Sequence, residues 1–312
     1  MSKPKVLQIG ALSERFNREL AECYEVTALW QRVDPLAFLQ EQGTAFELLV
    51  SSARFGCSAE QLACLPNLRA ICSFGVGYDP YPLELLRDRG IVISTTPDVL
   101  NDCVADLAMG LIIDTARQLA AADRFVRAGG WPAATFPLTR KVSGKKLGIV
   151  GLGRIGQAIA RRAEGFAMPV RYHKRCQDLS SPYGFEADLL ALARWADFLV
   201  LACPGGAATH HLIDADVLAA LGPQGILVNI SRGSVVDQPA LVTALLNGHL
   251  GGAGLDVFEG EPTVPAELFA LPNVVLLPHV GSGTHETRLR MEELVLANLQ
   301  AFIDKGELLT PL

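Results

Sequence analysis

One six-residue stretch, Gly151-Leu152-Gly153-Arg154-Ile155-Gly156, constrains the fold of this chain more than any other. Glycines with this spacing also occur in ordinary turns, so the flanking residues decide what the stretch means. Lys146 to Val150 is a short apolar run typical of a buried strand, and Gln157 to Ala163 has the composition of a helix. A strand, a glycine-rich turn and a helix in this order predict a dinucleotide-binding fingerprint.

Each glycine of the fingerprint has its own expected role. Gly151 allows the tight turn, Gly153 lets a pyrophosphate approach the backbone, and Gly156 allows the helix and the strand to pack closely. The N–H groups at the helix start then face the anion. We therefore expect the whole turn, including Leu152, Arg154 and Ile155, to bind the cofactor.

Composition excludes several classes of protein. With 312 residues, half of them hydrophobic, the chain is long enough for about two domains with large cores. The net charge of −6 and the lack of a basic stripe argue against a nucleic-acid partner. No apolar run is long enough to span a membrane. The seven cysteines are scattered without the spacing of metal ligands, and the N-terminus lacks the layout of a signal peptide. We therefore expect a cytoplasmic protein with reduced thiols and no metal site.

The first hundred residues alternate between strand and helix patterns, which predicts a parallel sheet covered on both faces. The expected strands are residues 5–9, 26–29, 48–51, 70–73 and 92–94. The expected helices are residues 15–23, 35–42, 59–65 and 82–89. A longer helix, capped by Asn101, follows Pro97 and presents an apolar face typical of a core or domain junction.

A second alternating series begins near Lys145. Its expected strands are residues 148–150, 170–173, 198–202, 226–230, 254–258 and 274–277. A last helix, about residues 284–303, is expected to return to the first domain. The fold class predicted is therefore α/β, with two doubly wound, Rossmann-like parallel-sheet domains and a cleft between them. Residues 1–98 with 286–312 form a flavodoxin-like substrate or catalytic domain, and residues 99–285 form the dinucleotide-binding domain.

Three polar side chains come just after three apolar strands of the second series: Arg232, Glu261 and His279. Ligands of open α/β sheets bind beyond the carboxyl ends of the strands, so all three are expected on the cofactor side. A guanidinium is suited to a carboxylate and an adjacent carbonyl oxygen. Histidine passes protons near neutral pH, and a glutamate orients it. With a nicotinamide to supply hydride, this set can reduce a 2-oxo acid.

Three motifs resemble those of the D-2-hydroxyacid dehydrogenase family, and the similarity runs over nearly the whole chain. They are residues 229–237 (NISRGSVVD), 252–262 (GAGLDVFEGEP) and 277–282 (LPHVGS). Within the family, the chain most resembles the glyoxylate/hydroxypyruvate and hydroxyphenylpyruvate reductases. The resemblance implies that Arg232 binds the substrate, that His279 is the acid/base, and that Glu261 is the partner of His279.

The resemblance also implies contacts and assembly that the residues alone do not show. The N–H groups of Val76 and Gly77 are implied to bind the substrate carboxylate. Further cofactor contacts are implied at Cys203, Pro204, Ile230, Asp256 and Gly281. Members of the family are usually homodimers, and Trp131 lies in the arm that commonly reaches the partner.

The chain departs from the family pattern at two places. Gly205-Gly206 stand where members often have a Leu-Thr pair, which leaves cofactor contacts of that loop in doubt. NAD enzymes need an acid at the end of the second strand for the ribose hydroxyl, but here the strand ends in His173, Lys174 and Arg175. Cations at this position suit a 2′-phosphate. These residues are therefore expected to bind the cofactor, and the cofactor expected is NADPH.

The expected activity is reduction of a small 2-oxo acid, such as glyoxylate or hydroxypyruvate, to the D-2-hydroxy acid. Two alternatives stay open: an NAD-dependent D-2-hydroxyacid dehydrogenase, and a cofactor-sensing binding protein of the same fold, like the corepressors that resemble this family. Fold alone does not decide between an enzyme and a binding protein. A phosphoglycerate dehydrogenase is disfavoured because no regulatory domain follows before Leu312.

Overall fold

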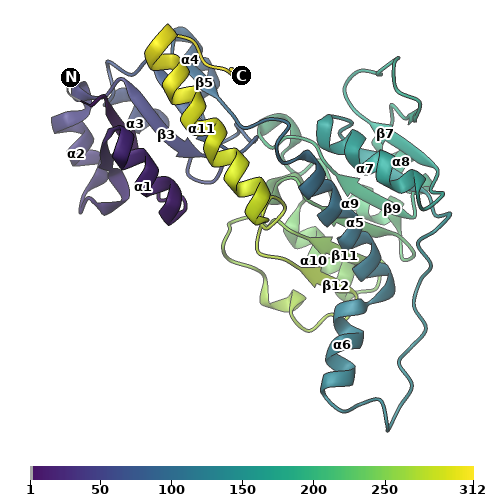
Figure 1. Ribbon diagram of the computed structural model, residues 1–312. Coiled ribbons are helices and arrows are strands. Elements are labelled where there is room, and N and C mark those ends of the chain that lie inside the picture. The colour runs from purple at the N-terminus through teal and green to yellow at the C-terminus, as the bar shows by residue number, and fades with distance from the viewer. Residues whose placement is uncertain (1–2) are drawn as a thin grey trace. The chain divides into compact units, whose positions relative to one another are not determined.

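The computed structural model describes residues 3–312 as two compact α/β units (Figure 1). The first unit runs to Leu100 and resumes from Thr284 to Leu312, and the second unit spans Asn101–Gly283. The sequence placed these boundaries after residues 98 and 285. Each unit has its own parallel sheet and its own hydrophobic core, so the prediction of two parallel-sheet α/β domains is confirmed.

The first unit contains a five-stranded parallel sheet in the order β2-β1-β3-β4-β5, which is the flavodoxin-like order. Its strands are β1 (Lys5–Gln8), β2 (Glu25–Ala28), β3 (Leu48–Ser52), β4 (Ala70–Phe74) and β5 (Val92–Ser94). Its helices are α1 (Glu14–Cys23), α2 (Pro35–Gln42), α3 (Ala59–Ala63), α4 (Leu83–Asp88) and α11 (His285–Lys305), with 3-10 turns η1 (Leu29–Gln31) and η2 (Gly43–Ala45).

Side-chain caps explain where three of these helices begin. The Ser13 hydroxyl accepts a hydrogen bond from the Phe16 N–H at the start of α1, and the Asp34 carboxylate accepts from two N–H groups at the start of α2. Ser58 and Gln61 form a reciprocal capping box at α3. Such caps satisfy N–H groups that have no partner within the helix.

The second unit contains a seven-stranded parallel sheet in the order β12-β11-β10-β9-β6-β7-β8. Its strands are β6 (Leu147–Val150), β7 (Val170–His173), β8 (Gly184–Phe185), β9 (Phe198–Leu201), β10 (Ile226–Asn229), β11 (Gly252–Leu255) and β12 (Val274–Leu276). Its helices are α5 (Asn101–Arg117), α6 (Leu119–Arg127), α7 (Arg154–Glu164), α8 (Leu189–Trp195), α9 (Ala215–Leu221) and α10 (Gln238–Leu246), with 3-10 turns η3 (Ala207–Thr209), η4 (Gly233–Val235) and η5 (Ala266–Leu268).

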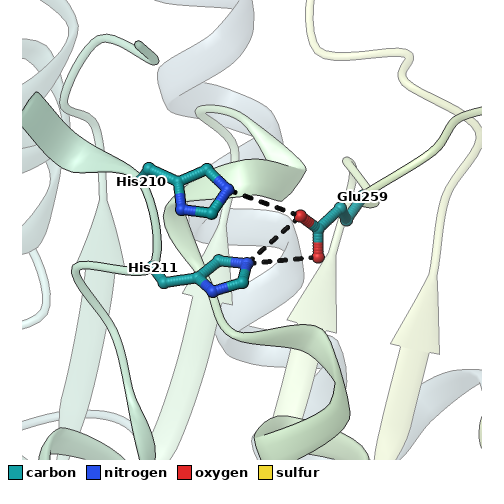
Figure 2. Close-up of side chains that lie close together, drawn as sticks. All are labelled: His210, His211 and Glu259. Carbon is teal, nitrogen blue, oxygen red and sulfur yellow. Dashed lines mark hydrogen bonds and ion pairs between the residues drawn. The ribbon is translucent and has the colours of Figure 1, made fainter. Parts of the chain in front are cut away.

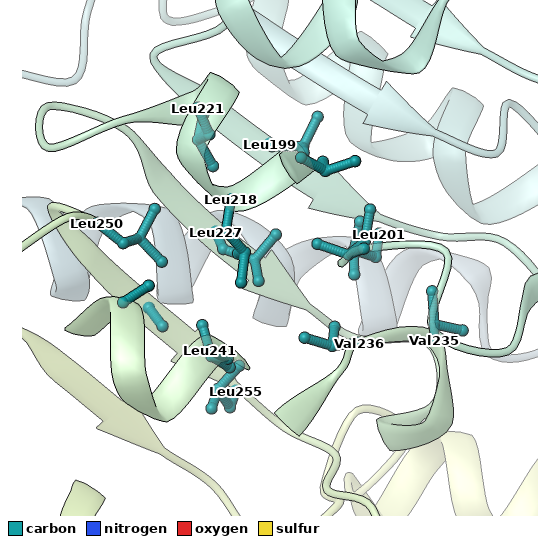
Figure 3. Packing of buried hydrophobic residues seen from close by; sticks show 14 of the residues in the cluster. Leu199, Leu201, Leu218, Leu221, Leu227, Val235, Val236, Leu241, Leu250 and Leu255 are labelled. Atoms are coloured by element: carbon teal, nitrogen blue, oxygen red, sulfur yellow. The ribbon is translucent and has the colours of Figure 1, made fainter. Parts of the chain in front are cut away.

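Helices cover both faces of this second sheet. On one face α5 packs against α7, β10 and β11, and a Cβ on Gly254 would lie 3.1 Å from the Leu111 Cβ, so a small residue permits this close approach. On the other face α8, α9 and α10 bury a leucine-rich cluster that includes Leu199, Leu218 and Leu227 (Figure 3). The two packed faces hold the strand ends, and the loops that follow them, in fixed positions.

Two local expectations were wrong, and one strand was missed. β11 ends at Leu255 rather than at residue 258: Val257 and Phe258 are buried, but outside the strand ladder, so their apolar pattern was misleading. β8 was missed because it has only two residues. Asn101 is the first residue of α5 rather than its cap. Among residues 3–312, no helix combines the length and the hydrophobicity that crossing a membrane requires.

Candidate active site

A histidine–carboxylate pair lies beyond the carboxyl ends of β11 and β12. Glu261 follows β11 and His279 follows β12, and these two strands are parallel neighbours. The Nδ1 of His279 lies 2.8 Å from Oε2 of Glu261. The structure therefore brings into direct contact two side chains that are 18 residues apart in the sequence.

Glu261 is held as a charged carboxylate. Burial acts to raise its pKa, but the hydrogen bond and positive charge of His279, the Phe258 N–H and the charge of Arg232 outweigh burial, and the pKa is lowered. The Phe258 N–H donates to Oε1 at 3.0 Å. A charged carboxylate can only accept, so the shared proton is on Nδ1 of His279. The Nε2 atom is then the position that exchanges a proton with a ligand.

Asp256 fixes the turn that carries His279. Its carboxylate accepts from the Val280 N–H at 2.7 Å and from the Gly281 N–H at 2.8 Å, and its carbonyl oxygen accepts from the His279 N–H at 2.9 Å. Burial raises the pKa of this carboxyl group. His279 has a left-handed φ of 54°, a conformation that L residues rarely adopt without such support. Sequence reasoning missed this supporting role.

Arg232 follows β10, the next strand of the sheet, and is half-buried. Its Nη1 donates to the Ser231 carbonyl at 2.8 Å, and the Asn229 amide donates to the Arg232 carbonyl at 2.9 Å. The next residue, Gly233, packs so closely on the Phe258 backbone that a Cβ would clash with it. The segments after β10 and β11 therefore hold Arg232 and Glu261 at one edge of the sheet.

The glycine turn has the predicted local structure. Gly151 follows β6 with φ 98°, and Gly153 is the N-cap of α7. A Cβ on Gly156 would clash with the Gly151 carbonyl oxygen, so close packing requires this glycine. A Cβ on Gly153 would meet no protein atom within 4 Å. Internal packing therefore does not explain Gly153, whereas a bound group close to the backbone would.

The end of β7 is basic in the structure as well. His173 Nδ1 lies 3.0 Å from the Glu186 carbonyl oxygen, Lys174 is half-buried and Arg175 is exposed. The acid that follows, Asp178, accepts hydrogen bonds from the Ser180 hydroxyl and N–H, and these bonds lower its pKa. Its carboxylate is thus engaged within its own turn.

The remaining predicted residues fall at two places. Cys203 and Pro204 come after β9, and Ile230 comes after β10. Cys203 and Ile230 are buried, whereas Pro204 is exposed. Burial raises the pKa of the Cys203 thiol to about 11. Val76 and Gly77 belong to the first unit, in the loop after β4. That loop is braced by a pair of hydrogen bonds between Gly75 and Thr96.

The family model described as D-isomer specific 2-hydroxyacid dehydrogenase, NAD binding domain, matches residues 109–281. The chain belongs to this family. Hydroxyphenylpyruvate reductase of Plectranthus scutellarioides is 46% identical over 98% of this chain and 98% of its own length. Glyoxylate/hydroxypyruvate reductase A of Arabidopsis thaliana is 45% identical over the same shares.

A solved 2-hydroxyacid dehydrogenase structure agrees with the fold. The NADPH-dependent glyoxylate/hydroxypyruvate reductase of Sinorhizobium meliloti, solved with NADP and malonate, is 42% identical and has a TM-score of 0.94. The superposition covers 100% of this chain and 97% of the chain in that structure. The family resemblance and the fold class predicted from the sequence are therefore confirmed.

Proposed function

We propose that this 2-hydroxyacid dehydrogenase reduces a small 2-oxo acid to the D-2-hydroxy acid with NADPH. The observation that carries the proposal is the contact between His279 and Glu261, at the sheet edge that also carries Arg232. A charged Glu261 fixes the proton of the imidazole on Nδ1 and leaves Nε2 to serve the substrate. The named activities of the two plant reductases and the bacterial reductase support this assignment.

The glycine turn fits the pyrophosphate of a dinucleotide. Gly153 leaves the backbone open to a close ligand, and the N–H groups at the start of α7 favour an anion. Arg154 places a positive charge at the same helix end, which the helix dipole disfavours unless an anion is bound. When bound, the cofactor supplies a hydride for the carbonyl carbon of the substrate.

The side chains of the chain itself bind and protonate the substrate. Arg232 provides a planar fork for the carboxylate and carbonyl oxygen, and charged His279 delivers a proton from Nε2 to the oxygen that becomes the hydroxyl. Glu261 balances the charge of the ring during this step. The N–H groups of Val76 and Gly77, in the first unit, are proposed to bind the substrate carboxylate.

The same edge of the second unit offers further cofactor contacts. We propose that Cys203, Pro204, Ile230, Asp256 and Gly281 line the nicotinamide end of the cofactor. Asp256 acts chiefly by holding the Val280–Gly281 turn, since both of its oxygens accept backbone hydrogen bonds there.

The basic end of β7 supports a preference for NADPH over NADH. Lys174 and Arg175 present cations there, and the carboxylate of Asp178 is engaged by Ser180. We expect Arg175→Ala to weaken NADPH binding by about ten- to a hundred-fold, because a charge-assisted hydrogen bond contributes about 1.5–3 kcal/mol. NADH binding should change little. Fluorescence titration with both cofactors measures this.

The matched control for this variant is Arg69→Ala, which removes an exposed arginine that pairs with Glu47 in the first unit. It should leave both affinities unchanged. Equal kcat/KM for NADPH and NADH in the unmutated protein would contradict the cofactor preference and favour the NAD-dependent alternative.

Glu261 affects the pH dependence of the reaction because its negative charge supports the protonated form of the proton donor. Its lowered pKa keeps the carboxylate charged to lower pH than an ordinary glutamate, so this support is present over the whole neutral range and is lost only in acid. In Glu261→Gln a neutral amide replaces this charge. The fall in kcat/KM for reduction with rising pH should move to lower pH, and oxidation of the hydroxy acid should begin to rise there. Superimposable profiles would mean that Glu261 does not tune the proton donor.

A substrate panel tests the assignment as an enzyme. NADPH oxidation is followed with glyoxylate, hydroxypyruvate and an aromatic pyruvate at equal concentrations. Turnover of a 2-oxo acid is the expected result, and the ratio of kcat/KM values identifies the substrate that fits best. Tight NADPH binding without turnover of any member of the panel would favour a cofactor-sensing binding protein instead.

The second unit has an exposed apolar segment that suits contact with another subunit. The segment from α6 to Leu138 carries exposed apolar side chains, with Trp131 70% and Leu138 102% exposed. Such an apolar surface suits a second copy of the chain, so we propose a homodimer.

All seven cysteines lie within the described residues, and none of them forms a disulfide there. This suits a reducing compartment, and we propose that the protein is cytoplasmic.

A further inference from the structure

A second cluster of ionisable side chains lies at the same edge of the second unit's sheet and plays no part in the proposed reaction. It consists of His210 and His211, which follow η3, and Glu259, which lies beyond β11 (Figure 2). His211 Nε2 is 3.1 Å and 3.3 Å from the two Glu259 oxygens, and His210 Nε2 is 3.8 Å from Oε1. One ligand atom from each residue lies within 4.8 Å of the others.

The backbone is bent to bring the two rings together. Successive side chains of an extended chain point to opposite sides. Here His211 has a left-handed φ of 50°, and the rings stack with centroids 3.9 Å apart, so that both point toward Glu259 (Figure 2). The His211 N–H donates to the Ser234 carbonyl at 2.8 Å, which holds this conformation. A strained backbone of this kind costs about 1–3 kcal/mol and is concentrated at functional sites.

Both sides of the cluster are fixed by their own hydrogen bonds. The Glu259 N–H donates to the Gln238 side chain at 3.0 Å, and the Gln238 amide donates back to the Glu259 carbonyl at 3.4 Å. On the histidine side, the Thr209 hydroxyl donates to the Pro204 carbonyl at 2.7 Å. The three ligand atoms are thus held by two supported loops.

The donor set suits a metal ion better than an ion pair. One carboxylate offsets the charge of one imidazolium, and a second charged ring stacked on the first is repelled by it. Two neutral imidazoles and a carboxylate are instead an ordinary ligand set for Zn²⁺. Tetrahedral Zn²⁺ with bonds of about 2.0–2.1 Å needs ligand atoms about 3.3 Å apart, close to the separations of Nε2 and Oε1 observed here. We propose that His210, His211 and Glu259 bind a divalent transition-metal ion of the Zn²⁺ type.

The proposed site would bind one metal ion per chain, and the bound ion would link two loops of the second unit. Three protein ligands leave a fourth position open to water or a small anion. The side chains are 55%, 35% and 34% exposed for His210, Glu259 and His211, so an ion can enter from solvent. A bound ion would join the loop of Gly205 and Gly206 to the segment that continues into Glu261. We therefore expect metal binding to stabilise the folded chain.

The test measures metal binding to the whole protein. After treatment with a chelator, Zn²⁺ is titrated calorimetrically, and Co²⁺ is added separately because its visible absorption reports tetrahedral coordination. The unmutated protein should bind one ion per chain and melt at a higher temperature with Zn²⁺. His211→Ala and Glu259→Gln should each weaken binding by about a hundred-fold or more, since even the loss of a supporting outer residue costs about 10–100-fold.

His249→Ala is the matched control, because it removes an exposed histidine outside the cluster. It should bind Zn²⁺ like the unmutated protein. Equal melting temperatures of all variants in chelator show that the changes in binding do not come from misfolding. Undiminished binding in Glu259→Gln and His211→Ala, equal loss in His249→Ala, or no binding by the unmutated protein would overturn the proposal and leave a histidine–carboxylate ion pair.

Discussion

His279→Ala should lower kcat for 2-oxo acid reduction by about 10²–10⁴-fold, which is the usual contribution of a positioned general acid. The variant keeps Arg232 and the glycine turn, so substrate and cofactor binding should change little. The physical reason is that the oxygen of the reduced substrate then takes its proton from water instead of from Nε2. Steady-state kinetics with saturating NADPH, together with a separate measurement of NADPH affinity, separate these two effects.

His249→Ala serves as the control for loss of an imidazole, because this side chain is exposed. It should retain full activity. A second variant, His279→Gln, keeps a side chain that can hydrogen-bond Glu261 but has no transferable proton, and should be about as slow as His279→Ala. If either His279 variant turned over at the unmutated rate, the proton donor would have to be another group.

Arg232→Lys should raise KM for the oxo acid and lower kcat, with a total loss in kcat/KM of about 10²–10⁴-fold if two charge-assisted hydrogen bonds are lost. Lysine keeps the positive charge, but it lacks the planar fork that can bind a carboxylate and a carbonyl oxygen together. The NADPH dissociation constant should stay near that of the unmutated protein. Initial rates over a matrix of both substrate concentrations measure all three quantities.

The matched control is Arg194→Lys, a conservative change at an exposed arginine that pairs with Asp188. It should leave kcat, KM and cofactor affinity unchanged. If NADPH affinity fell in Arg232→Lys as much as catalysis did, Arg232 would be a cofactor or structural group rather than a substrate ligand.

Much of the architecture could be predicted because it depends on short-range patterns. The apolar runs that became β6, β9 and β10 are buried on both faces, and the helix starts are marked by capping residues such as Ser13 and Asp34. The three polar residues of the candidate site could be picked out because each follows such a run. The rule that parallel strands present their carboxyl ends at one edge then indicated that these residues are neighbours.

Features that depend on contacts between distant segments could not be predicted. The clamp of Asp256 on Val280 and Gly281 joins residues that are 24 and 25 positions apart. The cluster of His210, His211 and Glu259 was missed because His211 and Glu259 are 48 positions apart. The left-handed backbone of His211 is supported by Ser234, and nothing in the local sequence marks it. The adjacent histidines were the one available signal.

In the proposed reaction a hydride from NADPH reaches the carbonyl carbon of a 2-oxo acid bound by this chain. It is tested most directly with NADPH that carries deuterium at the transferable position of the nicotinamide, using hydroxypyruvate or the best substrate of the panel. The product is analysed by mass spectrometry and by chiral chromatography. We expect one deuterium on C2 of the D-2-hydroxy acid for each NADPH consumed. Product without deuterium, the L enantiomer, or bound NADPH that is never consumed would contradict it.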